Sequence, residues 1–205
     1  MIRVEKGATR WTLTIDRPDK ANSLTKAMLE ELAAALAEAT EAQVPVLVLT
    51  GAGKVFSAGA DLDEARAGLA RDDVWERLSG AIAGFPGLSI AALNGTLAGG
   101  AFGMALACDL RIAVPGAKFF YPVMKLGFLP QPSDPGRLTA LVGPARAKLI
   151  LMAGQKITAE EALGFGLIER IVEAEALGEA VEALAEAAEV GKPEVRSEIK
   201  AMCNA

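Results

Sequence analysis

The sequence predicts a single α/β domain, and three observations support that prediction. Continuous apolar runs such as VPVLVLTGAG and LSIAAL are typical of parallel strands that are covered on both faces. Segments with apolar residues at helical spacing separate these runs, and such alternation defines the α/β class. The chain of 205 residues shows neither a linker nor an internal repeat. We therefore expect one domain over residues 1–205, with a helical C-terminal part from about residue 136.

Each element follows from its own residue pattern. Alternating apolar residues predict strands near the N-terminus, continuous apolar runs predict buried strands, and apolar residues three and four apart predict helices. The stretch KVFSAGADL is expected to be a loop. In chain order, the expected elements are strands over 2–6 and 10–16, a helix over 26–42, a strand over 44–53, a charged helical region to about residue 85, a strand over 88–93, a helix from about residue 98, a strand over 109–114, and helices beyond residue 136 that a strand-like segment interrupts at 166–172.

Composition excludes several kinds of chemistry. The chain has 0 histidines, which rules out nucleophile–histidine pairs and histidine-ligated metal sites. Cys108 and Cys203 form neither a disulfide framework nor a paired metal spacing, so no metal site is predicted. A net charge of −5 without a basic cluster argues against nucleic acid or an anionic membrane as partner. No signal peptide or membrane-length apolar run is present, so we expect a cytoplasmic protein.

The stretch LNGTLAGGAFGMALACD places four glycines between an apolar run and a helix-like segment. Glycine costs roughly 0.5–1 kcal/mol relative to alanine in regular structure, so these positions need a reason. A helix start offers unpaired amides to an anion, and Gly99 and Gly100 have no side chain to hold a ligand away from them. A second glycine turn, FSAGADL, follows another strand. Two such turns can aim one amide each at a single carbonyl oxygen, although the same glycines also suit helix–sheet packing.

Other glycine motifs fail on spacing. GTLAGG lacks the dinucleotide-binding pattern, and no acidic residue caps a second strand at the required distance. GAGK is not a phosphate-binding loop, because the upstream glycine spacing and the Ser or Thr after lysine are missing. FSAG is not a nucleophile elbow. A nucleotide-dependent oxidoreductase is therefore a disfavoured hypothesis.

Taken together, the motifs resemble the enoyl-CoA hydratase/isomerase family of the crotonase superfamily. The resemblance covers nearly the whole chain in family order, through IDRPDKANSLT, VLVLTGAGKVFSAGADL, AALNGTLAGGAFGMALACDLRIA, AKFFYPVMKLGFLP and LVGPARAKLILMAGQKITAEEALGFGLIERIV. It implies a crotonase-like spiral of ββα units with C-terminal helices, usually assembled as a homotrimer or a dimer of trimers. It also implies an acyl-CoA substrate, with no cofactor beyond the coenzyme A of that substrate.

The resemblance also implies a set of site residues. The backbone amides of Ala60 and Gly100 would form an oxyanion hole for the thioester oxygen. The residues that match the family's substrate-binding segments are Lys20, Ala21, Ala58, Gly59, Asp61, Leu62 and Gly99.

The chain departs from the family at the acid/base positions. The two glutamates of the family's hydratases fall on Gly103 and Val123, and a carboxylate used by other members falls on Gln131. None of these side chains can transfer a proton. Asp134 is the leading acid/base candidate, with capping of the next helix as its structural alternative, and Glu64 is a second candidate. Relatives continue into a further helical segment, which we expect to be shortened or absent here.

Two functional hypotheses remain open. In the first, the chain is an enzyme that stabilises a thioester enolate, as a double-bond isomerase or hydrolase rather than a true hydratase. The loss of both glutamates favours an isomerase or hydrolase over a hydratase, because isomerisation needs one proton-transferring group and hydration in the family manner needs two. The alternative is a non-catalytic acyl-CoA-binding protein that has kept the ligand site and lost the chemistry.

Overall fold

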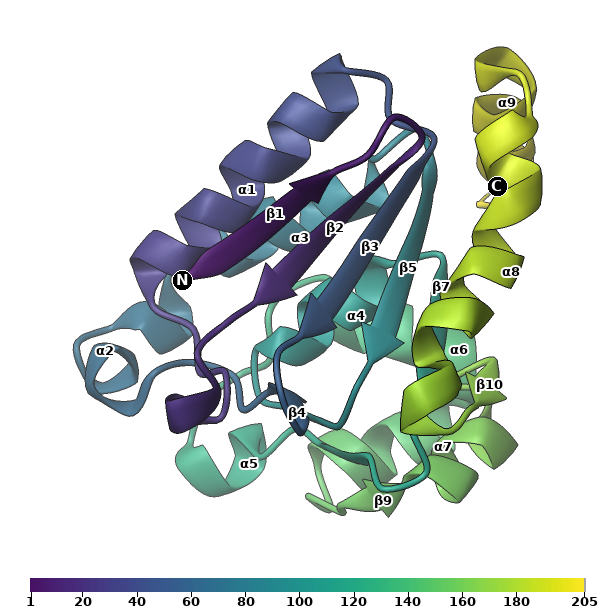
Figure 1. The fold of residues 1–205 in the computed structure, drawn as a ribbon. Helices are drawn as coiled ribbons and strands as arrows, with labels where there is room; N and C mark the ends of the chain where they lie inside the picture. The colour runs from purple at the N-terminus through teal and green to yellow at the C-terminus, as the bar shows by residue number, and fades with distance from the viewer. Residues whose placement is uncertain (205) are drawn as a thin grey trace.

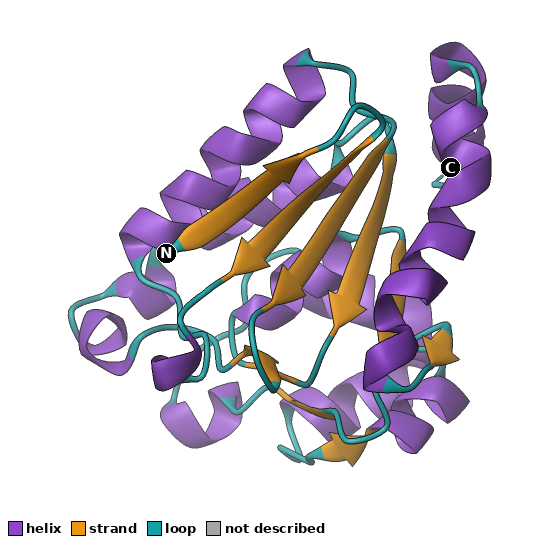
Figure 2. Ribbon diagram, viewed as in Figure 1, coloured by secondary structure: helices purple, strands orange, loops and turns teal. Residues whose placement is uncertain are grey.

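Two β-sheets and the helices around them make up the fold of the computed structural model, which describes residues 1–204 (Figure 1; Figure 2). The larger sheet pairs its first two strands antiparallel and all others parallel. In spatial order its strands are β1 (Ile2–Lys6), β2 (Arg10–Ile15), β3 (Val46–Gly51), β5 (Leu88–Leu93), β7 (Leu110–Ala113) and β10 (Arg170–Ile171).

The smaller sheet was not predicted from the sequence. Its strands, in spatial order, are β4 (Val55–Ser57), β6 (Thr96–Ala98), β8 (Lys118–Phe120) and β9 (Ile157–Thr158). The expectation of a loop over 54–62 is therefore wrong in its first half, and the helix expected from about residue 98 begins at Ala101 instead. Strands of two or three residues are too short to show an alternating pattern, so only pairing with their neighbours identifies them.

The two sheets are joined by a repeated structural unit. A long strand of the larger sheet leads into a short strand of the smaller sheet and then into helical structure, as in β3, β4 and α3 (Val74–Ala83). The same order recurs in β5, β6 and α4 (Ala101–Ala107), and in β7, β8 and α5 (Val123–Leu126). This repetition confirms the expected spiral of ββα units.

The remaining helices differ from the expectation in two places. The charged region before residue 85 is broken at Gly68, whose φ is +118°, so it forms short helical pieces before α3. The helix expected from about residue 136 begins two residues earlier and is kinked at Gly143. The other helices are α1 (Lys26–Glu41), α2 (Leu62–Arg66), α6 (Asp134–Leu151), α7 (Ala159–Phe165), α8 (Leu177–Val190), α9 (Pro193–Cys203), and the 3₁₀ turns Pro18–Lys20, Leu69–Arg71 and Ala174–Ala176.

The core lies on both faces of the larger sheet. On one face, α1, α3 and α4 pack in a single large cluster with strand residues such as Leu13 and Leu47. On the other face, Val181 and Ala185 of α8 cover Val46, Ile90 and neighbouring strand residues. Figure 1 shows α8 on the opposite side of the sheet from α1. Because both faces are covered, the strands read as continuous apolar runs in the sequence. No helix formed by residues 1–204 is long and apolar enough to cross a membrane.

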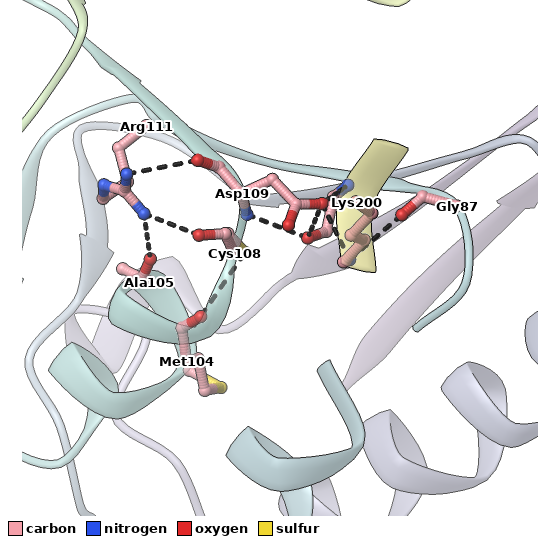
Figure 3. Close-up of polar contacts among 8 residues, drawn as sticks. Gly87, Met104, Ala105, Cys108, Asp109, Arg111 and Lys200 are labelled. Atoms are coloured by element: carbon pink, nitrogen blue, oxygen red, sulfur yellow. Dashed lines mark hydrogen bonds and ion pairs between the residues drawn. The ribbon is translucent and has the colours of Figure 1, made fainter. Parts of the chain in front are cut away.

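A polar cluster at the start of β7 holds the last helix against the body of the domain (Figure 3). Lys200 of α9 donates to the Asp109 carboxylate at 2.8 Å and to the Gly87 carbonyl at 3.1 Å. The same carboxylate accepts from the amide and the hydroxyl of Ser89. Arg111, which is 3% exposed, donates to carbonyls around the end of α4, including that of Cys108. One small network therefore connects the sheet, α4 and α9.

Lys200→Ala is expected to lower the free energy of unfolding by about 1–2 kcal/mol, because the largely buried Asp109 carboxylate loses its ion-pair partner. Urea denaturation of the variant and the parent measures the difference. Lys148→Ala is the matched control, since Lys148 is exposed on α6 and should change stability by less than about 0.5 kcal/mol. Equal losses in the two variants would show that the Asp109 contact contributes nothing.

Candidate active site

The segment after β2 and the turn after β4 lie side by side and support one another. Asn22 is fully buried, and its side-chain amide donates to the carbonyls of Ala52 and Val55 while its oxygen accepts from the Arg17 amide. A short parallel bridge joins Leu24 to Ala60. These contacts fix the backbone from Ala58 to Asp61, the segment that the sequence placed at the ligand site.

This turn packs directly against the glycine pair that precedes α4. Gly59 has φ +90°, and a Cβ atom built on it would lie 3.0 Å from the Ala98 carbonyl oxygen and 3.2 Å from the Gly100 amide nitrogen. Gly99 also has a positive φ, of +59°. The positive φ favours glycine at both positions, and at Gly59 the close approach of the neighbouring backbone adds a second reason. The structure thus brings together the two turns that the sequence singled out.

Both expected oxyanion donors are unpaired within the described part of the chain. In the bridge, the hydrogen bonds run from Leu24 N to the Gly59 oxygen and from Asp61 N to the Leu24 oxygen, so the Ala60 amide points away from the bridge. Gly100 is the N-cap of α4, and its amide precedes the first helical hydrogen bond. Neither amide donates a hydrogen bond to any of residues 1–204. Two free N–H groups on adjacent turns can both donate hydrogen bonds to one oxygen on which negative charge develops.

Trp75 covers the Gly100 turn on the side of α3. Three atoms of its indole ring lie 3.3 Å from the position of a Cβ on Gly100. Its Nε1 donates to the Leu69 carbonyl at 2.9 Å, and the residue is 2% exposed. The fixed ring therefore forms an apolar wall beside the Gly100 turn.

The remaining expected ligand-binding residues lie around the 58–62 turn. Asp61 is structural, since it pairs with Arg17 at 2.8 Å and accepts from the first amides of α2. The Arg17 hydrogen bond holds the pKa of Asp61 below its usual range. Lys20 and Leu62 are exposed, and the Ala21 carbonyl accepts from the Ala58 amide. These residues form one continuous edge beside the two free amides.

Asp134 lies at the first position of α6 and is fully buried. Its Oδ2 accepts a hydrogen bond from the Tyr121 hydroxyl at 2.9 Å. Its Oδ1 is buried and has no partner among the described residues. The carboxylate makes no capping hydrogen bond, because Ser133 is the N-cap residue, so the simple capping role is not observed. A buried oxygen without a partner is expensive in a folded protein and points to a role in function.

The surroundings of Asp134 favour its protonated form. Burial raises its pKa from 3.8 to about 6, against smaller opposing effects of the Tyr121 hydrogen bond and of Arg137. Burial also raises the pKa of Tyr121, so the phenol stays protonated and acts as the donor of the pair. A carboxyl group with a pKa near neutrality can both take up and release a proton, which is the requirement for general acid/base catalysis.

Gly103 explains how Asp134 fits into the site. A Cβ on Gly103 would lie 2.7 Å from Asp134 Oδ1, so the carboxylate fills the space that a side chain at this position of α4 would take. Gly103 follows Gly100 by three residues, which is just under one helical turn and about 4.5 Å along the axis. Val123 is buried, and the side chain of Gln131 donates to the Ala70 carbonyl.

The other acidic candidates are occupied. Glu64 accepts from the Lys26 amide at the start of α1 at 2.6 Å. Glu76 of α3 accepts from the amide and the hydroxyl of Ser133. Residues 1–204 hold no group of three or more acidic, cysteine or histidine side chains placed to bind a metal ion. Among these three carboxylates, Asp134 alone has a buried oxygen without a partner in the described residues.

Gly59→Ala is expected to lower kcat/KM by about 10²-fold, because the added methyl group would press on the Ala98 carbonyl and the Gly100 amide and separate the two donors. Gly68→Ala is the matched control. Gly68 also has a positive φ, of +118°, but a Cβ there meets nothing within 4 Å, so this variant carries the backbone strain without the contact. Steady-state kinetics of both variants checks the expectation, and equal activity in the two would contradict it.

Comparison with known proteins places this geometry in a family. Residues 5–205 match the family model described as enoyl-CoA hydratase/isomerase. The chain is similar to a probable enoyl-CoA hydratase of Mycobacterium bovis, with 34% identity over 94% of this chain and 76% of that protein. It is also similar to a short-chain-enoyl-CoA hydratase of Clostridium acetobutylicum, with 36% identity over 84% of this chain and 69% of that protein.

A solved structure shows the same fold. The crystal structure of an enoyl-CoA hydratase from Bacillus anthracis has a TM-score of 0.92 and 34% identity, covering 99% of this chain and 82% of that one. The fold and the paired glycine turns define an α/β enzyme of the crotonase type. The chain belongs to the enoyl-CoA hydratase/isomerase family.

Some residues of the site were not assigned a role from the sequence. Trp75 and Glu76 lie in the region expected to be a charged helix, and Asn22 lies in the stretch RPDKANSLT, whose turn residues predict a loop. From the sequence alone, Tyr121 is expected to be a packing residue. A buried polar or aromatic side chain whose partner is 13 to 61 residues away leaves no local signal, so contacts such as Tyr121–Asp134 and Gln131–Ala70 required the fold.

Proposed function

We propose that this chain is an enzyme that acts on acyl-CoA thioesters and stabilises a thioester enolate between the amides of Ala60 and Gly100. The observation that carries the proposal is the pair of free amides next to a buried carboxyl group with one unpartnered oxygen. The amides would hold the thioester oxygen as it becomes negative, and each such donor contributes on the order of 3–4 kcal/mol to the transition state. Asp134 would remove or deliver the proton at the neighbouring carbon.

A single available carboxyl group favours some reactions over others. Moving a proton between two carbons of an unsaturated acyl group needs one acid/base group, whereas hydration in the manner of two cooperating carboxylates needs a second. Because Glu64 accepts the amide at the start of α1 and both oxygens of Glu76 accept from Ser133, we propose a double-bond isomerase or a thioester hydrolase ahead of a hydratase. Isomerisation uses only the protein's own groups, whereas hydrolysis also consumes one water, whose oxygen joins the acyl carbon and whose proton goes to the leaving thiol. Coenzyme A is part of the substrate in both.

The coenzyme A portion would lie along the edge formed by Lys20, Ala21 and the 58–62 turn. The exposed ammonium group of Lys20 suits a phosphate, and the exposed side chain of Leu62 suits an apolar part of the ligand. We also propose that the protein assembles as a homotrimer or a dimer of trimers. Large exposed apolar side chains on α5 and α9, such as Met124 and Ile199, are consistent with buried interfaces in such an assembly. Sedimentation velocity tests this expectation.

Mass spectrometry of a mixed pool of saturated, 2-enoyl and 3-enoyl coenzyme A thioesters tests the proposed reaction. A change in retention at constant mass would indicate isomerisation, and free coenzyme A would indicate hydrolysis; either supports the proposal. Gain of water would contradict the preferred order and point to a hydratase. An unchanged pool, with a thioester retained on the protein through gel filtration, would overturn catalysis in favour of the alternative, a non-catalytic acyl-CoA-binding protein.

A further inference from the structure

The two oxygens of the Asp134 carboxyl group have different surroundings. Oδ2 accepts the Tyr121 hydroxyl at 2.9 Å, whereas Oδ1 has no partner among the described residues and faces the bare Cα of Gly103. A carboxyl group free to rotate would present either oxygen. Here the hydroxyl of Tyr121 distinguishes them, because it can bond only the oxygen that it reaches.

Tyr121 is itself held in place. It is 3% exposed, and its ring stacks on Phe102 with a centroid separation of 5.5 Å and an angle of 23° between the ring planes. Its hydroxyl oxygen also lies 3.5 Å from the donating amide of Gln131. Phe102 belongs to α4, between Gly100 and Gly103. The phenol is therefore fixed relative to the helix that supplies one of the two oxyanion donors.

We propose that Tyr121 is the positioning residue of the active site: its hydroxyl ties down Oδ2 of Asp134, so that Oδ1 is the oxygen that exchanges the proton with the substrate. Gly103 is the second part of this arrangement, because any side chain there would displace Oδ1. The inference rests on the proposed function, in which Asp134 is the acid/base. It also explains how a single carboxyl group can present one defined oxygen to the substrate without a second carboxylate to orient it.

The charged and titratable groups around Asp134 set the expected pH response. Burial raises its pKa, Glu76 of α3 raises it further, and Arg137 of α6 together with the Tyr121 hydroxyl lowers it. Removing the Tyr121 hydroxyl removes one of the two groups that lower the pKa of Asp134. The pKa of Asp134 is therefore expected to rise above its parent value in Tyr121→Phe, a change that a loss of packing alone would not produce.

Tyr121→Phe is the direct test, since it keeps the ring and removes only the hydroxyl. We expect kcat to fall about 10- to 100-fold with KM within about twofold, because the lost interaction orients the acid/base and does not bind the substrate. The midpoint of the pH–kcat profile should move to higher pH. Nuclear magnetic resonance titration of carboxyl-¹³C aspartate in the whole protein should show the same upward shift for the signal that Asp134→Asn removes.

Phe102→Leu serves as the matched control, since it removes the ring that stacks on Tyr121 but leaves the Tyr121 hydroxyl in place. This variant should lower thermal stability, and the midpoint of its pH–kcat profile should not move to higher pH. An unchanged kcat and an unchanged Asp134 pKa in Tyr121→Phe would overturn the inference. If the parent protein turns over no thioester, the proposed function fails. The titration still tests the contact in that case, and the positioning role as stated is overturned along with the reaction.

Discussion

Asp134→Asn is expected to abolish turnover of acyl-CoA thioesters and leave their affinity unchanged. The amide cannot take up a proton near neutral pH, while the edge along Lys20 and the 58–62 turn and the amides of Ala60 and Gly100 remain intact. A loss of about 10³-fold or more in kcat follows if Asp134 is the only acid/base group of the reaction. Kinetics and isothermal titration with a saturated acyl-CoA measure the two quantities separately. Normal turnover in this variant would show that the acid/base group lies elsewhere.

The same substitution has a predictable effect on stability. The pKa of Asp134 is raised in the folded state from 3.8 to about 6, so the folded protein binds this proton more tightly than the unfolded chain does. The stability that Asp134 contributes is therefore greatest below about pH 4 and is lost as the pH rises to about 6. The free energy of unfolding that is lost over this pH range is about 3 kcal/mol, because each unit of pKa shift corresponds to about 1.4 kcal/mol.

We therefore expect the Asn variant, which does not titrate, to gain stability relative to the parent as the pH rises from 4 to 7. Urea denaturation at several pH values measures this difference directly, and other carboxylates cancel because they are common to both proteins. Parallel stability curves would contradict a buried carboxyl group with a raised pKa. A stabilised but inactive variant is the pattern expected when an active-site residue is kept for function.

The second large effect concerns the space shared by Gly103 and Asp134. Gly103→Ala is expected to lower the free energy of unfolding by about 1–3 kcal/mol, because the methyl group would meet Asp134 Oδ1 at 2.7 Å in a packed interior. In an Asp134→Ala background the same change should raise it by about 1 kcal/mol, since the methyl group then fills vacated space and alanine suits a helix better than glycine. This reversal of sign is the expected coupling.

Gly136→Ala provides the reference for that cycle. Gly136 lies in the first turn of α6, and a Cβ there meets nothing within 4 Å. Its substitution should therefore show the helix-propensity gain alone, in both the parent and the Asp134→Ala background. Chemical denaturation of the set of variants provides all the required free energies. A Gly103→Ala effect that has the same sign and size in both backgrounds would show that the two positions do not share space.

The sequence predicted the long elements and the two glycine turns. Buried strands such as LSIAAL and the striped helix over residues 26–42 carry local patterns, and the motifs around Ala60 and Gly100 carried the family resemblance. The smaller sheet was missed, because its strands are two or three residues long. The helix after Thr96–Ala98 was placed too early for the same reason.

The role of Gly103 could not be derived from the sequence. From the residues alone, glycine at a position where related hydratases carry glutamate indicates lost chemistry. The structure shows that Asp134, which lies 31 positions later, fills that space. Likewise, nothing local to Tyr121 indicates a hydroxyl held against a carboxylate. Both features depend on how α4, α6 and the segment after β8 pack together, which no periodicity in the chain encodes.

The measurement that tests the central claim most directly is hydrogen–deuterium exchange at the α-carbon of a saturated acyl-CoA. Enolate formation needs only the two amides and one base, so exchange reports the proposed enolate step directly. In D₂O, the parent protein should add deuterium to the thioester, as seen by mass spectrometry, and Asp134→Asn should not. A bound thioester that gains no deuterium with the parent protein, or gains it equally with the variant, would contradict the account.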